Sequence, residues 1–154
     1  MPNKATDRRP TLALDTDLLV VGGGAAGLAS AVTAARAGVR VILLERYGFC
    51  GGAAVAGLSG TVCGMYAASE DARRPPEQLV FGFADEFVTL LCSHGGITDP
   101  IRYGKTFTLV HDPLMWREAA DHLLTQAGVD VLYHALVTAT LCDGDCRRDA
   151  KQGD

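Results

Sequence analysis

One stretch near the N-terminus constrains the fold more than any other part of the chain. It covers residues 17–46 and reads DLLVVGGGAAGLASAVTAARAGVRVILLER. The apolar run 18–21 is typical of a strand buried in a parallel sheet, and it stops at three glycines. An alanine-rich helical segment, Gly38 as its C-terminal cap and a second apolar run, 39–44, follow in order. This order predicts a βαβ unit.

The first glycines have the G-x-G-x-x-G spacing of dinucleotide-binding folds. Gly22 allows a sharp turn out of the strand, Gly24 lets a pyrophosphate approach the backbone, and Gly27 lets helix and strand pack closely. Free N–H groups at the helix start, near Ala25 and Ala26, favour an anion there. The spacing therefore predicts a phosphate-binding turn between strand and helix.

A carboxylate ends the second apolar run. Glu45 lies eighteen residues after Gly27, at the tip of the expected strand. An acid at this place can accept hydrogen bonds from the hydroxyls of an adenosine ribose. It would repel the 2′-phosphate of NADP, although Arg46 beside it weakens that argument. The acid alone is compatible with both NAD and FAD.

A second glycine pair separates these two cofactors. Gly51 and Gly52 follow soon after Glu45, and Ala53 begins a run of small residues. The pair offers a further backbone surface to a long ligand, and a simple NAD dehydrogenase does not need it. The sequence therefore favours FAD, with the NAD-binding domain of a dehydrogenase as an alternative.

The segment VVGGGAAGLASAVTAARAGVRVILLERYGFCGGAAVAGLSG resembles the N-terminus of FAD-dependent oxidoreductases of the glutathione-reductase-like superfamily. It is similar in particular to proteins like the flavin subunit of heterodisulfide reductase. The resemblance implies that the first glycines and Glu45 hold the ADP half of FAD, with Gly51 and Gly52 along the pyrophosphate. The later stretch FTLVHDPLMWREAADHLLTQAGVDVLYHALV is also similar, and there the strand near Val137 would contact adenine through its backbone.

The cysteines depart from one branch of that superfamily. Its dithiol reductases carry a Cys-x4-Cys pair just after the glycine pair, whereas here Cys50 precedes the glycines and the next cysteine is Cys63. Disulfide exchange is therefore not expected, and no metal site or iron–sulfur pattern is expected either. No catalytic residue is assigned, because His111 fits a helix entry better than a base. The expected cofactor-binding residues are Gly22, Gly24, Ala25, Ala26, Gly27, Glu45, Arg46, Gly51, Gly52, Ala53 and Val137.

Composition narrows the class of protein. The net charge is −4, and basic residues are scattered, so nucleic acid and anionic membrane surfaces are not expected partners. No apolar run is long enough to cross a membrane, and the polar residues 1–16 lack the apolar core of a secretory signal. We expect a disordered leader there. Five cysteines without framework spacing fit a reducing compartment, so a cytoplasmic location is expected.

The rest of the chain continues the alternation of helices and strands. Asp112 is suited to cap a helix at its N-terminus and Gly128 to end it. The third parallel strand is expected beside 39–44. The expected elements are a Gly/Ala/Ser-rich connector with a short helix (53–75), an amphipathic helix (77–93), a strand (107–110), a helix (113–127), a third parallel strand (129–133) and a further strand (136–141).

The expected fold is α/β, a Rossmann-like three-layer FAD/NAD(P)-binding domain over residues 17–142. Asp143-Gly144 predicts a hairpin, but the polar tail 143–154 has no apolar alternation for a return strand. We therefore expect a domain truncated before its last strands, completed by a partner chain or a missing C-terminal half. The expected function is the FAD-binding portion of a flavin-dependent oxidoreductase with non-covalent FAD and an unknown small-molecule substrate. The alternative is a non-catalytic nucleotide-binding fragment.

Overall fold

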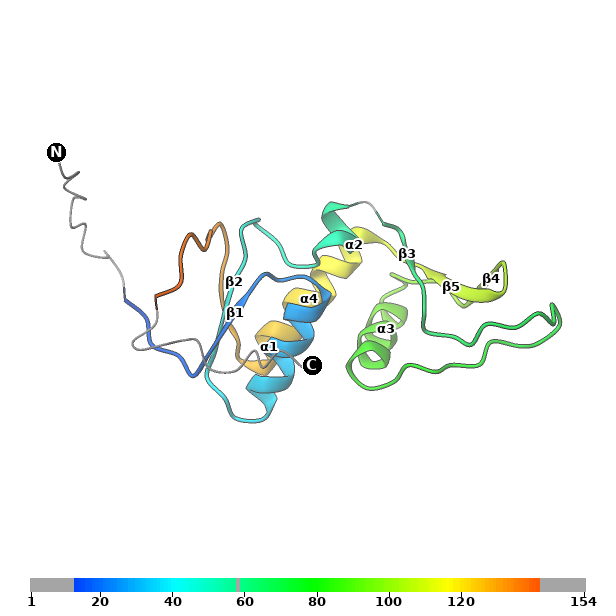
Figure 1. The fold of residues 1–154 in the computed structure, drawn as a ribbon, viewed down its shortest axis with the longest axis horizontal. Helices are drawn as coiled ribbons and strands as arrows, with labels where there is room; N and C mark the ends of the chain where they lie inside the picture. Colours follow the sequence, from blue (N-terminus) through cyan, green and yellow to red (C-terminus); the bar gives the residue numbers. More distant parts are fainter. Residues whose placement is uncertain (1–12, 58, 142–154) are drawn as a thin grey trace, which may run out of the picture.

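The computed structural model describes residues 13–57 and 59–141. A parallel sheet with two long helices on one face forms one end of the molecule, and a small antiparallel sheet forms the other (Figure 1). In chain order the elements are β1 (Leu18–Val21), α1 (Ala25–Arg36), β2 (Val41–Leu44), α2 (Ala53–Ala56), β3 (Thr61–Val62), α3 (Phe83–Ser93), β4 (Ile101–Tyr103), β5 (Thr106–Val110), α4 (Pro113–Ala127) and β6 (Asp130–Leu132).

The parallel sheet has the order β1-β2-β6. Val21 pairs with Leu44, and Leu44 pairs with Leu132, so the three strands end at one common edge. The third strand lies beside the second, as the sequence predicts. In such sheets ligands bind outside the carboxyl ends of the strands. Gly22 and Glu45 both follow strand ends and are therefore brought to the same edge.

The core lies between this sheet and helices α1 and α4. Leu28 and Val32 of α1, Leu43 of β2, and Leu123 and Leu124 of α4 are each at most 3% exposed. Burying a side chain of this size stabilises the fold by roughly 1.5–3 kcal/mol. The core therefore fixes α1 against the sheet and, with it, the turn that precedes the helix.

The predicted caps of α4 are confirmed. The Asp112 carboxylate accepts hydrogen bonds from the backbone N–H of Leu114 at 2.7 Å and of Met115 at 3.4 Å. Gly128 ends the helix in the left-handed region with φ 76°. Both caps are local in sequence, and together they set where β6 begins.

On the opposite face of the parallel sheet, apolar side chains are exposed to solvent. Leu19 is 49% exposed and Val21 is 60% exposed. Helices cover only one face of the sheet within the described residues (Figure 1). The architecture is the Rossmann-like α/β fold that the sequence predicts, with the sheet and one of its two expected helical layers among the described residues.

The predicted helix 77–93 is wrong in its first part. Helix α3 begins at Phe83, and Gly82 before it has φ 73°. Gln78 instead forms an antiparallel bridge with Tyr66, and the Leu79 N–H donates to the Met65 carbonyl at 2.8 Å. This pairing with a distant segment competes with the helix and replaces its first turns.

The predicted strand 136–141 is also wrong. Residues 133–141 have no helix or strand. The N–H groups of His134 and Ala135 instead donate to the carbonyls of Tyr47 and Glu45, which lie beyond the end of β2. The predicted hairpin at Asp143-Gly144 and the tail 143–154 lie outside the described residues, as does most of the predicted leader 1–16. The connector 53–75 does contain the expected short helix, α2, and also strand β3.

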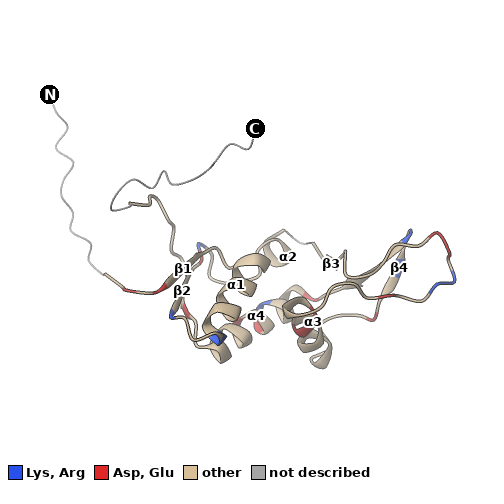
Figure 2. Cartoon of the chain, turned by 60° about the horizontal axis from the view of Figure 1, so that its bottom comes forward, with Lys and Arg blue, Asp and Glu red and all other residues tan. Residues whose placement is uncertain are grey.

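Charged residues of both signs are interspersed along the described part of the chain. Figure 2 shows basic and acidic residues in turn along the loop near β4, whereas α1 and α2 carry few charged residues. Within residues 13–57 and 59–141, no helix combines the length and the apolar character needed to cross a bilayer.

Candidate cofactor groove at the carboxyl edge of the sheet

A groove of about 530 Å³ opens at the carboxyl edge of the parallel sheet. It is formed by the ends of β1 and β2, by the second glycine loop, which contains Gly51 and Gly52, and by the segment after β6. Of the predicted site residues, Gly22, Glu45, Arg46, Gly52, Ala53 and Val137 line it. Val21, Leu44, Tyr47, Ala56, Gly57, Ala135 and Leu136 complete the lining. The groove therefore gathers residues that lie far apart in the sequence.

The backbones of the two glycine loops are in direct contact. The Gly51 N–H donates to the Gly23 carbonyl at 2.8 Å. A Cβ on Gly52 would lie 2.8 Å from the Gly24 Cα, closer than real Cβ atoms come, and Gly52 has φ 55°. Glycine is therefore required at Gly52 for two reasons, space and backbone conformation. The result is one continuous backbone surface made from both loops.

Gly27 has the packing role that the spacing predicts. A Cβ on Gly27 would fall inside the van der Waals surface of the Gly22 carbonyl oxygen. Gly22 itself has φ 95°, which makes the sharp turn out of β1. The first turn of α1 can approach the strand end only because residue 27 has no side chain.

Glu45 is a buried carboxylate with both oxygens engaged. Its Oε2 accepts a hydrogen bond from the Gly23 N–H at 2.7 Å, and its Oε1 accepts one from the Tyr47 N–H at 2.8 Å. The side chain is only 6% exposed. An ionised carboxylate has about four lone-pair sites, so acceptor capacity remains for ligand hydroxyls. Glu45 thus ties the first glycine loop to the end of β2 and also lines the groove.

Gly23 is a further site residue, outside the set predicted from the sequence. Its N–H holds Glu45, and a Cβ there would collide with the Cys50 Sγ. The G-x-G-x-x-G pattern uses only the glycines on either side of it. The run of three consecutive glycines was the sign of this role in the sequence, because the G-x-G-x-x-G pattern assigns no role to the middle glycine.

The start of α1 is open to an anion. Within the described residues, no side chain caps this helix end and no acidic residue occupies its first turn. Ala25 and Ala26 are exposed there, although neither lines the groove itself. The free N–H groups and the helix dipole together favour negative charge at this point.

The rim of the groove is partly apolar. Arg46 is exposed and lies over the Tyr47 ring, with its guanidinium carbon 4.5 Å from the ring centroid. Leu136 and Val137 are 72% and 37% exposed across the groove, in irregular backbone rather than in a strand. A flat apolar group such as a base could lie against these side chains.

Cys50 lies beneath the first glycine loop and is fully buried. Burial raises the pKa of its thiol to about 11, although a hydrogen bond with Tyr133 opposes the shift. Burial also raises the pKa of the Tyr133 hydroxyl, which donates to the Asp121 carboxylate at 2.6 Å. A neutral buried thiol is a poor nucleophile, so Cys50 has a packing role at this loop.

We expect Cys50 to react much more slowly with a thiol reagent than Cys63 at pH 8. Cys63 is exposed, whereas Cys50 is buried and protonated until the pH approaches about 11. The same raised pKa stabilises the fold below about pH 9, and this contribution disappears as the pH rises toward 11. Mass spectrometry of timed alkylation measures both rates. Equal rates for the two cysteines would contradict the assignment.

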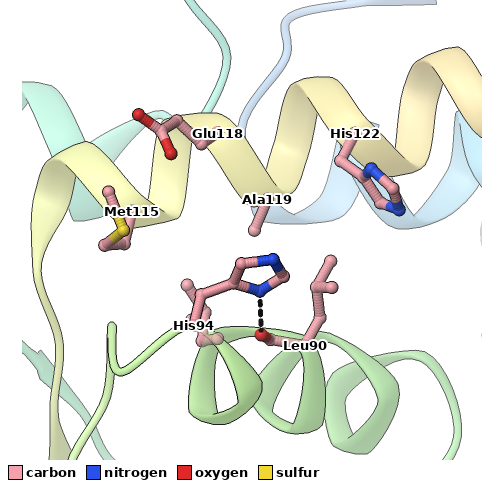
Figure 3. Close-up of a pocket in the computed structure, with 7 residues that line it drawn as sticks. Leu90, His94, Met115, Glu118, Ala119 and His122 are labelled. Carbon is pink, nitrogen blue, oxygen red and sulfur yellow. Dashed lines mark hydrogen bonds between the residues drawn. The ribbon is translucent and has the colours of Figure 1, made fainter.

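A second cavity, of about 180 Å³, lies between α3 and α4 (Figure 3). His94, Glu118 and His122 line it together with Met115 and apolar residues. The His94 Nδ1 is 2.8 Å from the Leu90 carbonyl oxygen, and Figure 3 shows Glu118 directed away from the His94 ring. Among residues 13–57 and 59–141, no three His, Cys, Asp or Glu side chains are grouped so as to hold a metal ion. His94 is the C-terminal cap residue of α3, and its ring contacts the last turn of that helix.

Comparison with known proteins identifies the family. The family model described as FAD dependent oxidoreductase matches residues 17–152. A urocanate reductase of Eggerthella lenta is 52% identical over 50 residues, which are 32% of this chain and 8% of that protein.

Two solved structures are also similar. The Thermovibrio ammonificans THI4 has a TM-score of 0.45 and 21% identity over 77% of this chain and 38% of that one. The amino acid oxidase NikD has a TM-score of 0.47 and 17% identity over 77% of this chain and 43% of that one. The chain therefore spans less than half the length of each of these relatives. It carries the FAD-binding portion of a flavin-dependent oxidoreductase, and it belongs to the FAD dependent oxidoreductase family.

Proposed function

We propose that the groove at the carboxyl edge of the sheet holds the ADP half of a non-covalently bound FAD. The observation that carries this proposal is the contact between the two glycine loops beside a fixed carboxylate. Gly51 bonds to Gly23, and Gly23 in turn bonds to Glu45. The residues proposed to contact the cofactor are Gly22, Gly24, Ala25, Ala26, Gly27, Glu45, Arg46, Gly51, Gly52, Ala53 and Val137.

Each part of the groove suits one part of the nucleotide. The backbone of both glycine loops and the open start of α1 suit the pyrophosphate. The lone pairs left on Glu45 suit the ribose hydroxyls, and the exposed side chains of Leu136 and Val137 suit the adenine face. FAD would supply the redox chemistry, while these residues bind and orient it.

We further propose that the chain belongs to the glutathione-reductase-like branch, near proteins similar to the heterodisulfide reductase flavin subunit. The glycine pair shortly after Glu45 supports this placement. Residues 17–142 would form the FAD-binding unit.

The flavin ring would need walls beyond this groove, from a partner chain or from further residues of a longer protein. No nucleic acid is proposed as a partner, because charges of both signs are interspersed. A cytoplasmic location is supported by the free thiols of Cys50, Cys63 and Cys92. The alternatives are a nucleotide-binding module without activity of its own and an NAD-binding domain.

Titration of the purified chain with FAD, with NAD in parallel, tests the proposal. We expect the visible absorption spectrum of FAD to shift saturably as the chain binds it. NAD should compete poorly for the site, because the second glycine loop adds surface for the longer ligand. Saturable binding of NAD without binding of FAD would favour the dehydrogenase alternative. Absence of binding by either ligand would contradict the proposal for this chain.

A further inference from the structure

His111 connects the end of β5 to the second glycine loop. It is only 6% exposed, and its Nε2 lies 3.1 Å from the Ala54 carbonyl oxygen. Because a carbonyl can only accept, Nε2 carries the proton and donates it. The other ring nitrogen, Nδ1, is buried and has no hydrogen-bond partner among the described residues. Among the described residues, the imidazole therefore makes one hydrogen bond, the one to the Ala54 carbonyl.

Helix α2, which carries the Ala54 carbonyl, is too short to be stable by itself. Helix α2 has four residues, and its internal bonds are those from Val55 and Ala56 to the Gly52 carbonyl and from Gly57 to the Ala53 carbonyl. A helix this short is unstable without tertiary contacts. The orientation of α2, and of the Gly51–Gly52 turn that leads into it, thus depends on the groups packed against it.

Trp116 of α4 supports the same loop. Its ring lies 4.6 Å from the His111 ring, measured between centroids. A Cβ on Gly51 would come within 3.0 Å of the Trp116 Cδ1, so the indole edge packs directly against the turn. The side chain is 8% exposed. His111 and Trp116 thus hold the second loop, which contacts the first loop through Gly51 and Gly52.

We propose that His111 is a positioning residue for FAD binding: through the Ala54 carbonyl it fixes α2 and the second glycine loop against the first loop. The inference rests on the proposed function, because the two loops are proposed to hold the pyrophosphate. It requires the tautomer with a proton on Nε2, because the Ala54 carbonyl can only accept. A merely space-filling role for the ring would require neither this tautomer nor a donor.

The tautomer is the first test and needs no cofactor. Nitrogen-15 spectra recorded at pH 8.5 show which ring nitrogen of each histidine carries the proton. We expect His111 to be the Nε2–H form. His94 is the internal control and should be the Nδ1–H form, since its Nδ1 contacts the Leu90 carbonyl. An Nδ1–H form at His111 would overturn the inference.

Substitution is the second test. The Gln side chain reaches as far as Nε2 and keeps a donor, whereas Leu fills the space without one. We expect His111→Leu to raise the Kd for FAD about tenfold, which corresponds to about 1.4 kcal/mol. His111→Gln should stay within about threefold of the parent. The matched control is His94→Leu, which removes a similar contact at the end of α3 and should leave the Kd unchanged.

Amide hydrogen exchange separates this inference from the proposed function. Without FAD, the amides of Val55, Ala56 and Gly57 should exchange faster in His111→Leu, while that of Trp116 in α4 should not. If the parent chain binds no FAD, the proposed function fails, and faster exchange would still show that His111 holds the loop. Unchanged exchange and Kd in His111→Leu, or equal losses in the Leu and Gln variants, would overturn it. If His111→Leu does not fold, His111→Asn, whose amide stops short of Ala54, replaces it.

Discussion

Gly24→Ala is expected to fold like the parent chain and to bind FAD on the order of 100-fold more weakly, a loss of about 2.7 kcal/mol. Gly24 has φ −73° and ψ −175°, which alanine adopts without strain, and the new Cβ would lie 3.8 Å from the Gly52 Cα, an ordinary contact. The methyl group would, however, occupy the backbone surface proposed for the pyrophosphate. Thermal unfolding and FAD titration measure the two effects separately.

Substitutions at two other glycines serve as comparisons for this prediction. Gly60→Ala is the matched control, because a Cβ there meets no atom within 4 Å, and it should change neither property. Gly27→Ala should instead destabilise the fold by about 3 kcal/mol and lower the Tm by roughly 10 °C, since its Cβ would collide with the Gly22 carbonyl. FAD affinity retained in Gly24→Ala would mean that the pyrophosphate does not lie at this turn.

Glu45→Ala is expected to harm both stability and binding. It leaves the N–H groups of Gly23 and Tyr47 without their acceptor, and a hydrogen bond to a charged group contributes roughly 1.5–3 kcal/mol. We therefore expect an unfolding free energy lower by about 3 kcal/mol. Loss of the ribose contacts should weaken FAD binding on the order of 10- to 100-fold. Chemical denaturation and FAD titration are the measurements.

A matched carboxylate control is Glu118→Ala on α4, which lies at the second cavity and should change neither value appreciably. Glu45→Gln keeps one acceptor oxygen and should fall between the parent and Glu45→Ala in both measurements. A Glu45→Ala chain with lower stability but unchanged FAD affinity would restrict Glu45 to holding the glycine loop.

Features encoded by local sequence were predictable. The strand, the glycine turn and α1 follow from a contiguous pattern, and the caps of α4 follow from Asp112 and Gly128. Gly27 was placed correctly because the motif itself encodes the close approach of helix and strand. The parallel partner strand β6 followed from the handedness of the crossover.

Features that depend on distant contacts were not predictable. The start of α3 is set by the pairing of Gln78 with Tyr66, which no local pattern reveals. The segment around Val137 has strand-like composition but lacks a described neighbour to pair with. Glu45 was recognised as a candidate ligand for ribose, yet its two backbone hydrogen bonds depend on how the glycine loop folds back over it.

Nitrogen-15 chemical-shift mapping during titration with ADP tests the central claim most directly, because ADP is the half of FAD assigned to the groove. We expect the largest shifts at residues 22–26, 45–47, 51–53 and 135–137. These segments are far apart in sequence and meet only at the carboxyl edge of the sheet. Shifts centred on His94 and His122, at the cavity between α3 and α4, would contradict the account.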